Sequence, residues 1–495
     1  MRRLSYAVMA SGLALGLCAS SPVLAQTRPS SSELEDLKQE IQKLQDRLRR
    51  LEEAQRPAPP PVAAQAPPPA PAPPGEREIS LERGSLLETI GLPRPEIGGL
   101  RISGFSVGSF SYNSRLQMVP EFAGSIPALA DPGRSNFRFD KFSLGISKTF
   151  APWLSAGAVM EVASARDRHS HGFDPAFGCP GTGVCIERFG TEAAETRVEL
   201  HRFHVTGIAP LGNGLALSFG RFDIPFGIER DDEPLLLTAT TSEVFRFGRP
   251  NSLTGFQTSY HFNPWLDVSA WVANRWESET TDDPFDDNNR DKSFGGRIGF
   301  TPIQGKGLLN FGFGGFWGPE QDDNTASKRW VLDFDFTWTP IPRLLLAGEA
   351  IYGGEDNRSF RQRGIPFPAP AVGNMDVNWW GFYLLAHYDL YDWLGLSFRY
   401  GYFDDMDAAR TGVKQKLQSW TFVPIIHLSR LIPDLRPLSA TYARTRHPID
   451  WVNLKVEYRF NRSNRPVFSD VQPGAPITAA DKTSHQVQVQ LDVSF

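Results

Sequence analysis

The chain has 495 residues and a formal net charge of −5, from 51 Lys and Arg against 56 Asp and Glu. Such a mild acidic balance over so long a chain argues against nucleic acid as a partner. After residue 25, no apolar run approaches the roughly 20 residues that a membrane-spanning helix needs. A membrane protein of this sequence would therefore have to cross as a closed β-barrel, which also satisfies every backbone group in lipid.

The first residues have the character of an export signal. Positive charges in Met1–Arg3 precede a short apolar stretch, Leu4–Leu17, and small residues flank a cleavage point between Ala25 and Gln26. We expect residues 1–25 to be a cleaved signal peptide. A lipoprotein acylated at Cys18 is the alternative, which is disfavoured because the residue before this cysteine is a leucine.

Export leaves two cysteines, Cys179 and Cys185, separated by a segment that contains Gly and Pro. In an oxidising compartment such a pair predicts a disulfide that closes a loop. The nearby His169 and His171 leave a metal site open as an alternative, but the cysteine spacing matches no usual zinc pattern. We expect no metal and no cofactor.

Residues 26–56 contain an apolar seam at alternating spacings of three and four, which predicts a coiled coil. The seam consists of Leu34, Leu37, Ile41, Leu44, Leu48 and Leu51. About three heptads are marginal alone, so this segment should assist an oligomer held mainly elsewhere. A lone amphipathic helix is the alternative. Residues 57–76, almost only Pro and Ala, predict an extended linker.

Residues 77–495 are rich in aromatic residues and glycine and show strand-like alternation. In the segment 330–339, Trp330, Leu332 and Phe334 belong to an apolar face, whereas the opposite face carries Val331 and the polar residues Asp333, Asp335, Thr337 and Thr339. A soluble sandwich would turn the apolar face inward, whereas an outer-membrane barrel turns it toward lipid and the polar face toward a wet lumen. Tryptophans at both ends of the apolar face favour the barrel. The same alternation closes the chain at 485–495, which ends on phenylalanine.

The connections alternate between short turns and long polar loops, as in bacterial barrels. Short turns are expected at 151–153, 263–265, 340–343 and 391–393, and long loops at 113–136, 166–194, 223–254, 277–291, 354–377 and 461–484. A weak seventeenth stretch, Leu438–Ala443, breaks the even parity that places both chain ends on one side. Omitting it predicts an all-β transmembrane barrel of 16 antiparallel strands, with 18 as the alternative.

Two segments resemble a known family. Gly220–Glu233, "GRFDIPFGIERDDE", is similar to a stretch in the phosphate-selective porin O/P group and its porin-2 relatives, and Val456–Phe468 is similar to their penultimate strand. The heptad segment resembles the coiled coil of related trimeric porins. The resemblance implies a homotrimeric outer-membrane diffusion channel whose third loop folds inward. The terminal Phe495 resembles the signal that the barrel-assembly machinery reads.

Charged residues on the expected inner face are the pore-lining candidates. They are Asp267, Arg275, Arg297, Asp333, Asp335, Glu349, Arg399, Lys455, Glu457 and Arg459. The constriction candidates on the third loop are Glu229, Arg230, Asp231, Asp232, Glu233, Glu243, Arg246 and Arg249. Both sets mix signs, whereas a ring of one sign would indicate ion selectivity. Phosphate selectivity is therefore not expected, and a transverse field suited to small polar solutes is our hypothesis.

No enzyme motif is recognisable, and we predict a passive pore for small hydrophilic solutes or ions, with outer-membrane lipid as its surroundings. The glycine-rich segment 312–318 lacks the dinucleotide fingerprint, and 304–307 lacks the residue that a P-loop needs after lysine. One alternative is a non-conducting anchor that contacts peptidoglycan through the N-terminal segment. A barrel enzyme such as a surface protease is a further alternative.

Overall fold

The computed structural model describes residues 96–97, 100–117, 135–164, 196–276, 287, 289–305, 307–321, 323–360, 373–411, 414–432, 452–469 and 481–495. The expected signal peptide, coiled coil and linker lie outside these residues, as do Cys179, Cys185 and Leu438–Ala443. Those expectations remain predictions. By their contacts, residues 78–495 form one compact unit, which is described by itself below.

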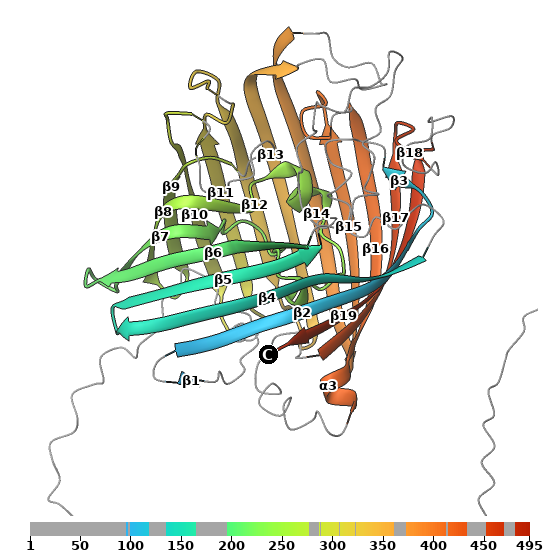
Figure 1. Ribbon diagram of the computed structural model, residues 1–495, viewed down its shortest axis with the longest axis horizontal. Helices are drawn as coiled ribbons and strands as arrows, with labels where there is room; N and C mark the ends of the chain where they lie inside the picture. The colour runs from blue at the N-terminus through green and yellow to red at the C-terminus, as the bar shows by residue number, and fades with distance from the viewer. Residues whose placement is uncertain are drawn as a thin grey trace, which may run out of the picture. The chain divides into compact units, whose positions relative to one another are not determined.

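Sixteen antiparallel strands close into a barrel, as the sequence predicts (Figure 1). They are β2 (Leu100–Asn113), β4 (Ser135–Ala151), β5 (Leu154–Ser164), β6 (Thr196–Ala209), β7 (Leu215–Asp223), β8 (Ser252–Asn263), β9 (Leu266–Ala273), β10 (Ser293–Ile303), β11 (Leu309–Gly318), β12 (Arg329–Trp338), β13 (Leu344–Phe360), β14 (Gly373–Tyr391), β15 (Leu394–Asp405), β16 (Gln415–His427), β17 (Val452–Ser463) and β19 (Thr483–Ser494). Two-residue strands β1 (Glu96–Ile97), β3 (Leu116–Gln117) and β18 (Phe468–Ser469) lie at their ends.

Each barrel strand pairs with its neighbours in the chain, and β19 pairs with β2 to close the ring. The last residue takes part in this closure. Phe495 N–H donates to Gly104 O and Gly104 N–H donates to Phe495 O, both at 2.9 Å. The Phe495 ring also stacks on Phe142 with centroids 6.0 Å apart. A closed ring leaves no unpaired strand edge, which a sheet in lipid requires.

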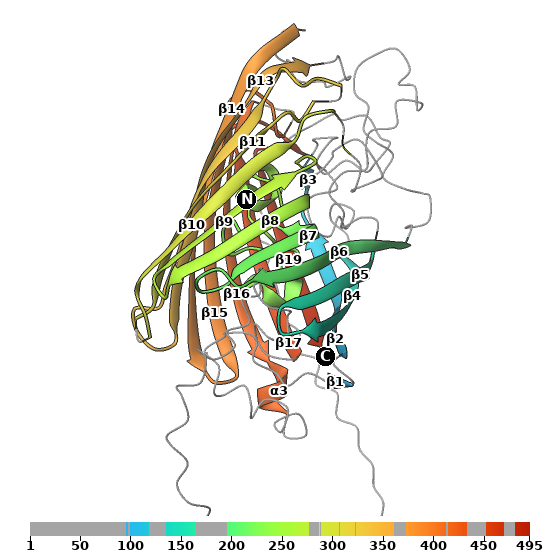
Figure 2. The same ribbon diagram turned by 90° about the vertical axis from the view of Figure 1, so that its left-hand side faces the viewer.

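The two ends of the barrel differ. At one end, short turns join β4 to β5, β8 to β9 and β14 to β15, where residues 152–153, 264–265 and 392–393 intervene. Both β1 and the C-terminus lie at this end (Figure 2). The long connections lie at the opposite end, except that from β16 to β17, which begins with α3 (Leu428–Leu431) at the short-turn end. The expected loop 354–377 is too long, because β13 runs on to Phe360 and β14 begins at Gly373. Beyond the lipid zone both strand faces meet water, so the sequence alternation that marks a strand is lost there.

The distribution of side chains is the reverse of that in a soluble protein. On β12, Leu332 is 59% exposed, whereas Asp333 and Asp335 on the opposite face are 4% and 1% exposed. The same division holds on β19, where Val487 and Leu491 face outward and the intervening glutamines are buried. An apolar outer belt around a polar interior is expected for a barrel that contacts lipid on its outside and polar groups or water on its inside.

Tryptophans divide between the two faces. Trp153, Trp265, Trp317, Trp338 and Trp393 are exposed, at positions near the strand ends that suit interfacial aromatic residues. By contrast, Trp271 and Trp379 are 2% and 0% exposed and belong to the interior apolar cluster. The sequence pattern alone does not distinguish these interior tryptophans from those at the lipid interfaces. Within the described ranges, no helix is both long and apolar enough to cross a membrane.

Candidate functional site: a loop folded into the barrel

Residues 224–251, which we call the inner loop, connect β7 to β8 and fold into the barrel interior (Figures 1 and 2). The loop contains two helical turns, η3 (Glu233–Leu235) and η4 (Val244–Gly248). Every residue of η4 is buried, and η4 packs against β13, β14 and β15, while η3 packs against β2 and β19. The third long connection thus crosses the interior, the placement that the family resemblance implies.

Apolar side chains hold the loop against inward-facing aromatics of the wall. Phe226 meets the edge of Trp271 with ring centroids 5.6 Å apart, and Phe247 packs against Phe403 at 5.7 Å. Glycines of β11 make room for this contact. A Cβ at Gly314 would lie 2.2 Å from the Phe226 ring. The glycine-rich segment 312–318 therefore serves close packing inside the barrel.

Gly227 brings the loop backbone against a carboxylate pair. Its φ is +58°, a conformation that costs other residues free energy, and a Cβ there would lie 1.8 Å from Glu349 Oε2. Its N–H donates to Asp335 Oδ2 at 3.3 Å. Asp335 also accepts from Arg297 Nη2 at 3.0 Å, so the loop joins an existing ion pair of the wall.

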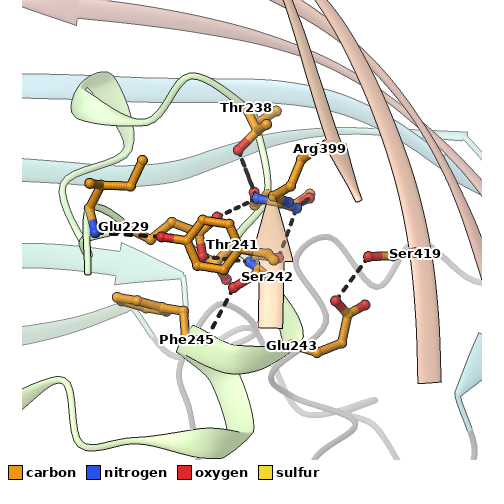
Figure 3. A network of polar contacts seen from close by, with 12 residues as sticks. Glu229, Thr238, Thr241, Ser242, Glu243, Phe245, Arg399 and Ser419 are labelled. Atoms are coloured by element: carbon orange, nitrogen blue, oxygen red, sulfur yellow. Dashed lines mark hydrogen bonds and ion pairs between the residues drawn. The ribbon is translucent and has the colours of Figure 1, made fainter. Parts of the chain in front are cut away.

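Two arginines of the wall, Arg399 and Arg459, bind the turn at residues 238–242, and Figure 3 shows the contacts of Arg399. Arg399 Nη1 donates to Glu229 Oε1 at 2.5 Å, to Thr238 Oγ1 at 2.9 Å and to Thr240 O at 2.5 Å. Arg459 Nη1 donates to Thr240 Oγ1 at 2.9 Å and to Thr241 O at 2.8 Å. The rigid fork of donors in a guanidinium suits several hydrogen bonds to neighbouring oxygen acceptors. Neither side chain is more than 3% exposed.

Carboxylates complete this contact. Glu457 Oε2 accepts from the backbone N–H groups of Ala239 and Thr240 at 2.7 and 3.1 Å. Glu243 is ion-paired with Arg459 and accepts from Ser419 Oγ at 2.9 Å. Because an unpaired buried charge is costly, this alternation of acids and bases stabilises one loop position.

Arg249 and Glu349 form a second buried pair at 2.5 Å, with side chains 1% and 0% exposed. Arg249 also donates from Nη2 to Glu229 O at 3.2 Å and lies over the Phe245 ring at 4.8 Å. Arg246 is 9% exposed. Both arginines are thus buried in the folded loop, and their role at a constriction stays a prediction.

The acidic segment of the loop contacts the opposite wall. Lys141 Nζ on β4 donates to Asp231 O at 2.8 Å and lies 3.0 Å from Glu233. Arg202 on β6 pairs with Asp223 at 2.6 Å and Asp232 at 2.8 Å. Burial raises the pKa of Glu233 to about 8, against the lowering effect of the Lys141 ammonium.

A cavity of about 220 Å³ lies between this side of the loop and the wall of β2, β4, β5 and β6. Its wall side carries Arg101, Arg202 and His204 among serines, and its loop side carries Arg230, Asp231 and Asp232. Arg249 also borders the cavity, whereas Arg246 does not. A space of this size holds on the order of seven waters at ~30 Å³ each. Both signs of charge line it.

The strand candidates lie on the inner face as expected, but most of them are packed beneath the loop. Residues no more than 7% exposed are Arg297, Asp333, Asp335, Glu349, Arg399, Lys455, Glu457 and Arg459. Asp267 is partly exposed and lies 3.8 Å from Arg297, and Arg275 is buried just beyond the end of β9. The prediction located the correct face. It did not foresee that the loop would cover these charges.

Several contact residues were missed from the sequence. Lys141, Arg202, Trp379 and Arg410 all contact the loop or its carbonyl groups. Strand alternation could have placed Lys141 inward with Ser143, since both lie two residues apart on β4. Nothing local marks Arg410, which belongs to another connection. Among the described residues, no group of three or more His, Cys, Asp or Glu side chains could hold a metal ion.

The family described as "Putative beta-barrel porin-2, OmpL-like" matches residues 187–494, more than half of the chain. The chain belongs to this family. Membership in the porin-2 family agrees with the 16-stranded barrel and its interior loop, and it makes the chain an outer-membrane porin by family. The phosphate-selective O/P group is not matched by this finding. No curated protein matches the chain.

Solved structures with a similar arrangement are distant from this porin-2 chain. The outer membrane channel DcaP of Acinetobacter baumannii is 12% identical, with 81% of this chain and 99% of that chain covered and a TM-score of 0.49. The anion-selective porin from Comamonas acidovorans is also 12% identical, with 80% of this chain and 99% of that chain covered and a TM-score of 0.46. Salmonella typhi OmpF in complex with daunomycin is 11% identical, with 82% of this chain and 99% of that chain covered and a TM-score of 0.47. Similarity at this level carries no argument about selectivity.

Proposed function

We propose that this porin forms a channel for passive diffusion of small hydrophilic solutes or ions across the outer membrane. The observation that carries the proposal is the interior loop, which crosses a barrel with an apolar outer belt and a charged inner face. A loop held in the lumen limits the size of what can pass without closing the barrel. Passive diffusion needs no catalytic group, which suits a lumen of paired charges.

The route follows from where the loop packs. From β12 to β17 the loop covers the inner wall, and the charges there are used in ion pairs. On the opposite side the acidic segment of the loop contacts Lys141 of β4 and Arg202 of β6, and the 220 Å³ cavity is lined by this segment together with β2 and β4–β6. We infer that solutes pass on this side, between Arg101, Arg202 and His204 on the wall and Asp231 on the loop. A lining of both signs favours small polar solutes over one class of ion.

A homotrimer is part of the proposal, because a coiled coil is predicted at residues 26–56 and this segment resembles the coiled coil of trimeric porins. The same segment, followed by the Pro/Ala linker, would reach into the periplasm and contact peptidoglycan. These assembly features rest on the sequence alone. The barrel would remain the conducting part.

Planar bilayers with purified protein test the function. Stepwise conductance increases are expected, with weak cation or anion preference in a salt gradient. Asp231→Asn should shift the reversal potential toward anion preference, because it removes a negative charge from the cavity lining. Arg343→Gln is the matched control, since Arg343 pairs with Asp392 on the exposed short-turn end. A protein that inserts but never conducts would refute the proposal, and equal reversal potentials for Asp231→Asn and wild type would refute the route.

A further inference from the structure

The connection between β15 and β16 forms a tight turn around one carboxylate. Asp405, which is fully buried, accepts from the N–H groups of Ala409, Arg410 and Thr411 at 2.7, 3.0 and 2.6 Å. It also accepts from Thr411 Oγ1 at 2.8 Å. Ala408 adopts φ +61° at the bend. Four hydrogen bonds to one charged acceptor fix the shape of this turn.

The turn delivers Arg410 into the barrel interior, where it is 4% exposed. Its guanidinium lies 5.0 Å from the Trp276 ring centroid and 5.4 Å from that of Trp379. Its Nε donates to Phe247 O at 2.5 Å. Phe247 belongs to η4 of the inner loop, so a side chain of one connection reaches the backbone of another 163 residues earlier.

The next carbonyl of η4, that of Gly248, accepts a hydrogen bond from one of the two tryptophans that Arg410 contacts, which together we call the tryptophan cluster (Trp276 and Trp379). Trp379 Nε1 donates to Gly248 O at 2.9 Å. The last carbonyls of a helical segment have no partners within it, and side-chain donors can satisfy them. Arg410 and Trp379 supply donors to two consecutive carbonyls at the end of η4. The cation and the indole rings also stabilise one another.

We propose that Arg410 is a positioning residue that holds the inner loop in its inward place and thereby sets the width of the channel. The inference rests on the proposed function, since it links a loop position to conduction. Arginine suits the role because its planar group can lie against both rings while it donates to Phe247 O. Lysine would keep the charge and lose the planar contact.

Arg329 provides a matched control. It lies over the same Trp276 ring at 5.2 Å, but its Nε bonds Glu355 at 3.0 Å instead of the inner loop. Glu355 keeps a second partner, Arg358, at 2.7 Å when Arg329 is removed. Arg329→Ala therefore disturbs the tryptophan cluster without removing a bond to η4.

The experiment compares Arg410→Ala, Arg410→Lys, Trp379→Phe and Arg329→Ala in the full-length porin. Trypsin cleavage after Arg246 reports loop release, and heat-modified mobility on gels confirms that each barrel is folded. Single-channel conductance and open-channel noise report the channel. Cleavage in Arg410→Ala should be about tenfold faster than in wild type, the factor that corresponds to a loss of about 1.4 kcal/mol. Its conductance and noise should rise.

Arg410→Lys should give an intermediate cleavage rate, Trp379→Phe a smaller increase, and Arg329→Ala the wild-type rate. Folded Arg410→Ala barrels that resist trypsin and conduct as wild type would overturn the inference. An equal increase in Arg329→Ala would also overturn it, because the effect would then belong to the tryptophan cluster. If Arg410→Ala does not fold, Trp379→Phe decides in the same way. Faster cleavage in a protein that never conducts would instead refute only the channel function.

Discussion

At the scale of single residues, the interior is shaped by positions that have no room for a side chain. Gly312 lies where a Cβ would come within 2.2 Å of Arg297 Nη2, and Gly227 lies where one would strike Glu349. These glycines allow buried ion pairs and the loop backbone to come together. The sequence shows the glycines, but only the packed interior shows which atoms approach them.

Gly227→Ala should destabilise the inner loop more than a comparable glycine substitution elsewhere. The left-handed backbone costs about 1–3 kcal/mol at such positions, and the clash with Glu349 adds to it. Gly305→Ala is the control, because Gly305 has φ +76° and no heavy atom within 4 Å of its added Cβ. We would measure the temperature at which the folded, heat-modifiable band disappears on gels, and the rate at which trypsin cleaves the loop. Equal losses in both variants would show that backbone strain alone matters at residue 227.

At the scale of elements, the strands could be predicted and the loop contacts could not. Alternation on β12, β15, β17 and β19 assigned the faces correctly, because lipid and interior impose a period of two on each strand. The extensions of β13 and β14 were missed, since polar residues such as Glu355, Asp356 and Arg358 interrupt the apolar alternation there. The inner loop carries no period, and its position depends on wall residues far away in the sequence.

The stability of the barrel should depend on pH through a buried carboxyl group in a connection between strands. Glu320, on the connection between β11 and β12, accepts from Ser293 Oγ and from Trp276 N, both at 2.5 Å. Burial raises the pKa of its carboxyl to about 7. Because the pKa is raised above its unfolded value of 4.5, its stabilising contribution is present below pH 4.5 and is lost as the pH rises to 7.

Wild-type porin should therefore melt at a lower temperature at pH 8 than at pH 5, and Glu320→Gln should reduce this difference. The largest effect would be about 3 kcal/mol for a shift of this size. Apparent melting temperatures by circular dichroism at both pH values check the expectation. An unchanged pH difference in Glu320→Gln would assign the effect to other groups, such as Glu233.

At the scale of the whole molecule, closure of the ring is what makes a polar interior possible. Strand β19 pairs with β2, and the chain end at Phe495 bonds Gly104. No strand edge then faces lipid, and every charge named in the site lies inside one unit that spans residues 78–495. The channel should accordingly depend on the barrel alone, and the N-terminal segment should serve assembly.

Deletion of residues 26–76, with the signal peptide kept, should leave the single-channel conductance unchanged. The proposed homotrimer should dissociate at a lower temperature or detergent concentration, because the three predicted heptads would add a modest contribution to an interface that we expect the barrels to form. Bilayer recordings and crosslinking of purified protein measure the two effects. Loss of conductance with an intact barrel would assign the segment to the pore itself.

The sequence by itself determined that the chain forms a barrel of 16 strands and which strand faces are apolar. These features follow from local rules, since each strand residue meets either lipid or the interior. Tertiary structure decided that Arg399, Arg459 and Glu457 hold a loop instead of lining open water, and that Arg410 reaches η4. Ion pairs and hydrogen bonds join residues more than 150 positions apart, and no local pattern records such partners.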